Sequence, residues 1–151
     1  MSNVRRAPFA ELADDPEFKA ITELYALESK IEGMPDCDWQ RETYQHMENV
    51  GLMKTLIATN DQGKVIGFML MLVTVLPHYN RICATTESIF VLPDHRKGGA
   101  GVKLIKEAEA WAKELGAVGI LLSAPKGGRL EAVAPRLGYT ATNTALFKGL
   151  L

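Results

Sequence analysis

A stretch in the second half of the chain, residues 94–104, combines glycine with positive charge in a pattern typical of ligand-binding loops. It has the sequence DHRKGGAGVKL and follows a strand-like run at residues 88–92. Glycine lets a turn adopt backbone angles that strain other residues, and it lets the main chain approach a ligand closely. Free N–H groups and the dipole at the start of the following helix favour phosphate or pyrophosphate. We therefore expect an anion-binding loop, with positive charge from Arg96 and Lys97.

Two common phosphate-binding motifs do not match this loop. A P-loop requires Gly-Lys-Ser/Thr, which the chain lacks. A dinucleotide fingerprint requires GxGxxG, whereas Gly99 and Gly101 are followed by Leu104. The pattern Arg96-x-x-Gly99-x-Gly101 after a strand instead resembles the (Gln/Arg)-x-x-Gly-x-(Gly/Ala) acetyl-CoA loop of the GCN5-related N-acetyltransferase (GNAT) superfamily. A glycine-rich turn without a ligand is the alternative.

The resemblance implies acetyl-CoA as co-substrate and assigns roles to two groups of residues. Acetyl transfer requires a deprotonated amine, an aligned thioester, stabilisation of the oxyanion and a proton for the departing thiolate. The backbone of the strand before the loop would hold the thioester arm and polarise its carbonyl, through Ile89, Phe90 and Val91. The loop and helix start would hold the pyrophosphate, through Arg96, Lys97, Gly98, Gly99, Ala100, Gly101 and Val102.

Glu87 is the carboxylate that we expect to act as general base. It lies nine residues before Arg96, where many GNAT members carry a glutamate with that role, often acting through water. Strict alternation places its side chain on the face of Ile89 and Val91, unless a bulge resets the phase. Apolar neighbours disfavour the charged form of a carboxylate, which suits a base. The alternative is an edge carboxylate that pairs with Arg81 or a lysine.

The chain departs from the family at the residue expected to protonate the thiolate. Many members have a tyrosine four residues before the glycine of a Gly-Phe/Tyr pair; here that pair is Gly138-Tyr139, and Ala134 replaces the tyrosine. Protonation is left to water, to Ser123 or to Tyr139. Ser123 has the alternative role of capping the chain, and Tyr139 that of a core residue. The departure also favours an alternative function, a non-catalytic acyl-CoA-binding or sensing module.

Other charged and metal-binding candidates carry less information. The resemblance implies that Asp36 and Asp38, in the loop between the first two helices, receive a cationic acceptor, although such residues more often form turns and caps. Lys126 and Arg129 are candidates for the 3′-phosphate of CoA or for a solvated face. The three histidines are far apart in the sequence and have no metal-type spacing, so we expect no metal site.

The elements that position these residues follow from periodicity and turn signals. Helices are predicted from about residue 15 to Gly33, and at residues 38–50, 101–115 and 128–137. Strands are predicted at residues 4–10, 53–59, 65–76, 81–91 and 118–122, and the last strands at residues 139–140 and 144–148. Gly67, inside a long apolar strand, indicates a bulge or a close backbone approach.

This order predicts an α/β fold of the GNAT type in a single domain, residues 1–151. Its central sheet is mixed, an antiparallel meander followed by a parallel βαβ crossover, and helices flank it. The resemblance covers residues 50–148 well. It implies that the strand before the loop and the strand after the crossover helix splay apart, with acetyl-CoA in the resulting cleft.

Composition limits the partners and the compartment. The net charge of −1 gives no reason to expect nucleic acid or an anionic membrane. The longest apolar run is 12 residues, too short to span a bilayer. Two cysteines, Cys37 and Cys83, are too few for a disulfide scaffold. We expect a cytoplasmic protein, with the homodimer that is usual in the family.

The sequence therefore predicts an acetyl-CoA-dependent N-acetyltransferase. Its acceptor is a primary amine of a small molecule or a peptide, and antibiotic, polyamine, amino acid and protein amines all stay open. A purely structural interaction domain is a third possibility, but it leaves the glycine loop unexplained.

Overall fold

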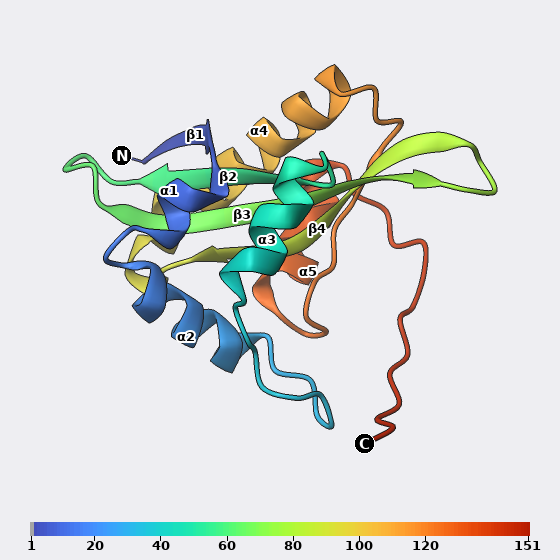
Figure 1. Cartoon of the computed structure of the whole chain (residues 1–151), viewed down its shortest axis with the longest axis horizontal. Coiled ribbons are helices and arrows are strands. Elements are labelled where there is room, and N and C mark those ends of the chain that lie inside the picture. Colours follow the sequence, from blue (N-terminus) through green and yellow to red (C-terminus); the bar gives the residue numbers. More distant parts are fainter. Residues whose placement is uncertain (1) are drawn as a thin grey trace.

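A computed structural model describes residues 2–151 and shows a five-stranded sheet in the order β1-β2-β3-β4-β5 (Figure 1). The first four strands are antiparallel and β5 is parallel to β4. The mixed sheet predicted from the sequence is thus confirmed, and β2, β3 and β4 have the predicted bounds. The strands are β1 (Asn3–Ala7), β2 (Met53–Thr59), β3 (Val65–Leu76), β4 (Arg81–Val91) and β5 (Ile120–Leu121).

Helices cover both faces of the sheet (Figure 1). On one face lie α1 (Phe9–Ala13), α2 (Phe18–Glu28) and α3 (Arg41–Asn49), over a core that includes Phe9, Ile21 and Phe68. On the other face α4 (Ala100–Glu114) crosses the strands and buries Leu104 and Ala108 against them. The crossover helix predicted for residues 101–115 is confirmed to within one residue at each end.

Gly67 lies where two strands approach closely, as its position in the apolar run predicts. The β2–β3 register shifts between Ala58 and Thr59, next to Gly67. A Cβ atom on Gly67 would lie 2.6 Å from the carbonyl oxygen of Phe90 on β4. Only glycine lets the backbones of β3 and β4 pack at this distance.

A second irregularity lies in β4 and involves Glu87. Leu70 pairs with Ser88, and Met71 pairs with Thr86, so Glu87 has no partner on β3. This extra residue is a β-bulge, which changes the direction of the side chains that follow it. The bulge therefore resets the alternation on which the predicted face of Glu87 depends.

The N-terminal elements differ from the prediction. Residues 4–10 were expected to be a strand, but β1 ends at Ala7 and α1 begins at Phe9. Phe9 and Leu12, one helical turn apart, are both buried. The backbone N–H of Phe9 donates to Glu48 Oε2 at 2.7 Å, so a side chain of α3 satisfies the start of α1. Similarly, α2 begins at Phe18 and ends at Glu28, inside the predicted limits.

The prediction for the C-terminal part is wrong in two places. The strand expected at residues 118–122 is only Ile120–Leu121, and residues 139–151 contain no helix or strand. An alternating apolar pattern forms a strand only where a neighbouring strand offers backbone hydrogen bonds, and β5 is too short to offer them. The helix expected at residues 128–137 is present as α5 (Arg129–Val133) followed by the 3-10 helix η2 (Ala134–Leu137), with Gly138 in the left-handed conformation.

None of the helices in the described part of the chain is long and apolar enough to cross a membrane.

Candidate active site

The glycine loop forms a tight connection from β4 to α4. After Leu92 the chain turns through the 3-10 helix η1 (Pro93–Gly98). Gly99 then adopts the left-handed conformation, with φ of +79°, and α4 begins at Ala100. A Cβ atom on Gly98 or Gly99 would meet no atom within 4 Å. Glycine is therefore needed at Gly99 for its conformation, and the space around the loop is open to a ligand.

The first N–H groups of α4 are free. No side chain caps the helix, and its first backbone hydrogen bond runs from Lys103 N–H to the Gly99 carbonyl at 3.0 Å. Among residues 2–151, no hydrogen-bond acceptor takes up the N–H groups of Ala100, Gly101 or Val102. Such groups, with the positive end of the helix dipole, are suited to a phosphate oxygen.

Arg96 is turned back toward the protein. Its Nε donates to the Val91 carbonyl at 2.8 Å, and its Nη2 lies 2.7 Å from Glu28 Oε2 on α2. The guanidinium also lies over the ring of Phe90, 5.2 Å from its centroid. In this arrangement Arg96 joins η1 to β4 and α2, whereas Lys97 is exposed.

One edge of β4 is open where the two parallel strands diverge. β5 pairs only with Ala84 and Thr85. The N–H of Leu92 donates to Ile66 on β3. Because backbone groups alternate in direction along an antiparallel strand, the N–H and carbonyl of Val91 and Ile89 point to the opposite, open edge. The Arg96 contact to the Val91 carbonyl agrees with this direction.

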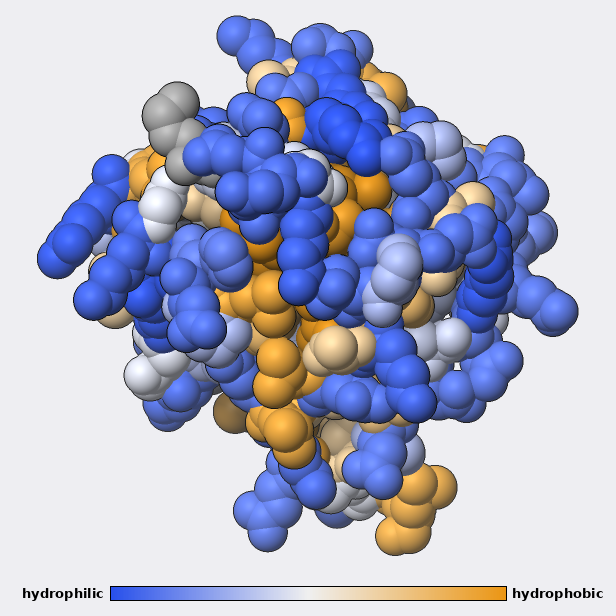
Figure 2. Space-filling view, turned by 90° about the vertical axis from the view of Figure 1, so that its left-hand side faces the viewer, coloured by the Kyte–Doolittle hydropathy of each residue, from blue (hydrophilic) through white to orange (hydrophobic). Residues whose placement is uncertain are grey.

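The same alternation turns the amide of Phe90 toward its partner Phe68 on β3. Of the three residues predicted to hold the thioester arm, Ile89 and Val91 thus present backbone groups to the open edge, and Phe90 does not. Figure 2 views the molecule from the side on which η1 lies in Figure 1, and shows a narrow band of hydrophobic surface framed by hydrophilic side chains.

Glu87 faces the helices α2 and α3. Its Oε1 accepts a hydrogen bond from the Tyr44 hydroxyl at 3.3 Å, and its Oε2 accepts one from Ser88 Oγ at 2.6 Å. Ile89 and Val91 pack into the core under α4, on the other face. The bulge has therefore moved Glu87 away from the face that strict alternation predicts.

Two tyrosines surround the Glu87 carboxylate. Burial, followed by the nearby negative charge of Glu87, raises the pKa of the Tyr44 hydroxyl above the ordinary tyrosine value. The same two causes, in the same order, raise the pKa of Tyr25. Both side chains are therefore neutral hydrogen-bond donors at physiological pH. No local signal in the sequence connects Tyr25 or Tyr44 with Glu87.

The two candidates for the general acid lie in different surroundings. Ser123 is exposed and follows β5, and its backbone N–H donates to Thr86 Oγ1 at 2.8 Å, so it lies beside the bulge of β4. The Tyr139 hydroxyl donates to Glu109 of α4 at 3.0 Å. Burial and this contact raise its pKa. Because α4 and α3 cover opposite faces of the sheet, the structure does not bring Tyr139 to Glu87.

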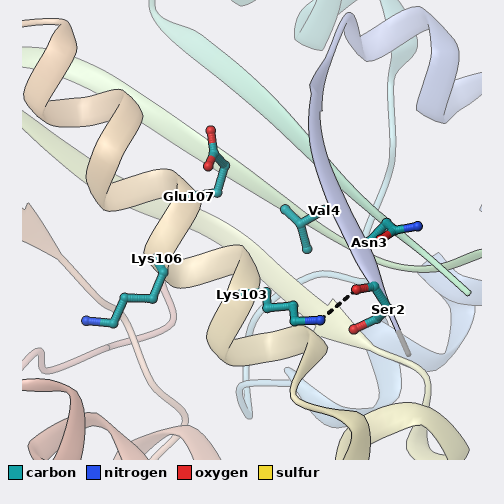
Figure 3. Close-up of a pocket in the computed structure, with 6 residues that line it drawn as sticks. All are labelled: Ser2, Asn3, Val4, Lys103, Lys106 and Glu107. Atoms are coloured by element: carbon teal, nitrogen blue, oxygen red, sulfur yellow. Dashed lines mark hydrogen bonds between the residues drawn. The ribbon is translucent and has the colours of Figure 1, made fainter.

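Lys103, in the first turns of α4, also points away from the loop. Its Nζ donates to the Ser2 carbonyl at 2.7 Å (Figure 3). This contact crosses a surface pocket of about 370 Å³ between β1 and α4. The pocket lies on the α4 side of the sheet and contains none of the predicted site residues.

The remaining charged candidates lie at the surface. Asp36 and Asp38 are exposed in the segment between α2 and α3, and Asp38 accepts a hydrogen bond from the side chain of Gln40. Lys126 and Arg129 are exposed near the start of α5. Among the described residues, no group of three His, Cys, Asp or Glu side chains is arranged to hold a metal ion.

Comparison with known proteins identifies the family. A model of the acetyltransferase (GNAT) family matches residues 18–139, most of the chain. The protein belongs to the GNAT acetyltransferase family. Members of this family use acetyl-CoA as co-substrate.

The known proteins that this GNAT chain resembles include one curated relative and two solved structures. The curated relative is aminoglycoside N(6′)-acetyltransferase type 1 of Acinetobacter genomosp. 13, which is 34% identical over 65 residues; the match covers 42% of this chain and 44% of the relative. A ribosomal-protein-alanine N-acetyltransferase from Brucella melitensis biovar Abortus 2308 has a TM-score of 0.72 at 20% identity, covering 97% and 96% of the two chains.

The other solved structure is an aminoglycoside acetyltransferase from an uncultured soil metagenomic sample. It has a TM-score of 0.75 at 17% identity and covers 99% of this chain and 97% of its own. Because the sequence identities are low, both structures show only that this chain shares their fold.

Proposed function

We propose that the protein transfers the acetyl group of acetyl-CoA to a primary amine. The observation that carries the proposal is that the open edge of β4 leads directly into the free start of α4. The two features are joined by η1 and by Gly99 in its left-handed conformation. Together they offer backbone donors along one continuous path.

The residues at this path fit acetyl-CoA. The N–H groups of Ala100, Gly101 and Val102 would hold the pyrophosphate, with Lys97 adding positive charge. The backbone groups of Ile89 and Val91 would hold the thioester arm. Arg96 would contribute by shaping the loop and, once released from Glu28, by its charge.

When bound, acetyl-CoA supplies an activated acyl group, and the side chains of the protein handle the protons. Glu87 accepts the proton of the attacking amine, directly or through a water molecule. Backbone N–H groups at the open edge of β4 stabilise the negative charge that develops on the carbonyl oxygen. Water protonates the departing thiolate, because Tyr139 is held by Glu109, the family tyrosine is replaced by Ala134 and Ser123 is exposed to solvent.

For the acceptor we propose a small polycationic molecule of the amino-sugar class. Residues 28–42, which run from the end of α2 into α3, contain five carboxylates and two cationic side chains. This segment adjoins the tyrosines around Glu87. Relatives named as aminoglycoside acetyltransferases support the same class. An amine at the N-terminus of a peptide is the second candidate, because a ribosomal-protein-alanine N-acetyltransferase shares the fold.

Calorimetric titration with acetyl-CoA tests the cofactor site. We expect a micromolar Kd, about −8 kcal/mol, and no measurable binding to Gly99→Glu. Gly116→Glu is the matched control: Gly116 has a φ of +85° and open space, like Gly99, but lies at the opposite end of α4. Retained binding by Gly99→Glu, or equal loss in both variants, would refute the placement.

Release of CoA thiol then separates an enzyme from an acyl-CoA-binding module. The wild-type protein is mixed with acetyl-CoA and either sisomicin, the ligand of a solved aminoglycoside acetyltransferase with the same fold, or a peptide that begins with alanine. Faster release with sisomicin supports the amino-sugar class. Binding of acetyl-CoA without release by either amine favours the binding module.

A further inference from the structure

Tyr44 reaches the predicted site from an element that the sequence did not connect with it. The residue lies in α3, and its hydroxyl donates to Glu87 Oε1 on β4 at 3.3 Å. Glu87 itself is the unpaired residue of the β4 bulge. The contact thus joins α3 to the carboxylate that is proposed as general base.

The ring of Tyr44 is fixed by stacking on both sides. It lies 5.0 Å from the ring of Phe9, with an interplanar angle of 19°, and 5.3 Å from that of Trp39, with an angle of 17°. Phe9 is buried in the core, 1% exposed. Aromatic stacking at these distances restricts the ring to one orientation. The position of the hydroxyl is therefore set by core packing.

The carboxylate of Glu87 has one donor on each oxygen. Ser88 Oγ donates to Oε2 at 2.6 Å, and Ser88 is buried. Each carboxylate oxygen can accept about two hydrogen bonds, so each keeps a free lone pair. The two donors on opposite oxygens fix the plane of the carboxylate without using up its capacity to accept a proton.

Resting on the proposed function, we propose that Tyr44 is a positioning residue for Glu87. With Ser88 it holds the carboxylate in the orientation in which a free lone pair accepts the proton of the attacking amine. In that step the N–C bond forms and the C–S bond breaks. The amine proton goes to Glu87 and later to solvent, and the thiolate takes a proton from water.

Few other titratable groups act on this pair. Tyr25 of α2 interacts with the charge of Glu87, and Cys37, in the segment after α2, interacts with both tyrosines. None of these groups is cationic, so the hydroxyls of Tyr44 and Ser88 are the donors that the structure places on the carboxylate.

The test is a double-mutant cycle with Tyr44→Phe, Glu87→Gln and the combined variant, using acetyl-CoA and sisomicin. Phenylalanine keeps the ring stack and removes only the hydroxyl. We expect kcat to fall roughly five- to tenfold in Tyr44→Phe, with an unchanged KM for acetyl-CoA. Tyr79→Phe, at the exposed β3–β4 turn, is the control for the substitution itself.

The cycle decides whether Tyr44 acts through Glu87. If it does, Glu87→Gln and the combined variant have the same rate, because the carboxylate that Tyr44 positions is already gone. The proposal would be overturned if Tyr44→Phe lowered kcat by the same factor in Glu87→Gln as in the wild-type protein. An unchanged kcat in Tyr44→Phe would also overturn it.

A measurement without turnover separates this proposal from the proposed function. If the wild-type protein releases no CoA with sisomicin, the function fails for that acceptor, and the contact is judged by NMR. The ¹³Cζ resonance of Tyr44, assigned by its loss in Tyr44→Phe, should move in Glu87→Gln while that of Tyr79 stays in place. A Tyr44 resonance that does not move would overturn the positioning role.

Discussion

Replacing Gly67 by alanine should destabilise the sheet next to the open edge of β4. The added Cβ would lie 2.6 Å from the Phe90 carbonyl oxygen and 3.1 Å from the Val91 Cα. These neighbours are backbone atoms, so β3 and β4 must separate. Overpacking of this kind costs about 1–3 kcal/mol. Weakening a ladder hydrogen bond, such as that from Leu92 to Ile66, costs roughly 1 kcal/mol more.

We therefore expect Gly67→Ala to lower the free energy of unfolding by about 2–4 kcal/mol and the Tm by roughly 5–15 °C. Urea titration followed by circular dichroism measures the first quantity, and a thermal scan the second. Gly119→Ala is the matched control, because a Cβ there meets no atom within 4 Å. The added methyl group lowers the entropy of the unfolded chain equally in both variants. Gly119→Ala should therefore be as stable as the wild-type protein or up to about 1 kcal/mol more stable. Equal stability of the two variants would refute the steric argument.

Two further predictions concern ion pairs. Glu28→Gln releases Arg96 from its partner and should tighten acetyl-CoA binding about two- to fivefold, as expected for a partly exposed ion pair of roughly 0.5–1 kcal/mol. Glu23→Gln on the same helix is the control. Weaker binding in Glu28→Gln would show that the ion pair instead orients Arg96 for binding. The Arg6 guanidinium lowers the pKa of Glu114 through a hydrogen bond. The ion pair therefore stabilises the fold at pH values above the ordinary pKa of glutamate, and this stabilisation is lost as the pH falls and Glu114 takes up a proton. Arg6→Gln should therefore lower the Tm at neutral pH by more than at pH values below that pKa, and an equal difference at both would contradict this origin.

The part of the fold predicted to the residue is the three-stranded meander. Its signals are local: long apolar runs form β2 and β3, and a polar cluster between them forms the turn. The structure shows how that turn works, since Asn60 Oδ1 accepts the backbone N–H groups of Gln62 and Lys64, both at 3.0 Å. Such contacts lie within five residues and are encoded where they occur.

The elements that were missed depend on distant partners. α1 was predicted as the end of a strand, because the carboxylate that satisfies its first N–H belongs to Glu48, 39 residues later. The last strands were predicted from alternation, yet residues 139–151 have no neighbouring strand with which to pair. In both cases the pattern in the sequence is compatible with either structure, and the partner decides.

At the candidate site, the conformation of the loop follows from local residues. Gly99 is needed for its positive φ and Ala100 begins the helix, so the free N–H groups follow from a few adjacent residues. The direction of the Glu87 side chain, by contrast, depends on contacts between distant segments. A bulge between β3 and β4 turns the carboxylate toward α3, where the ring stack of Phe9, Tyr44 and Trp39 places a hydroxyl against it. Strand register and core packing are properties of segments far apart in the chain, and no local pattern records them.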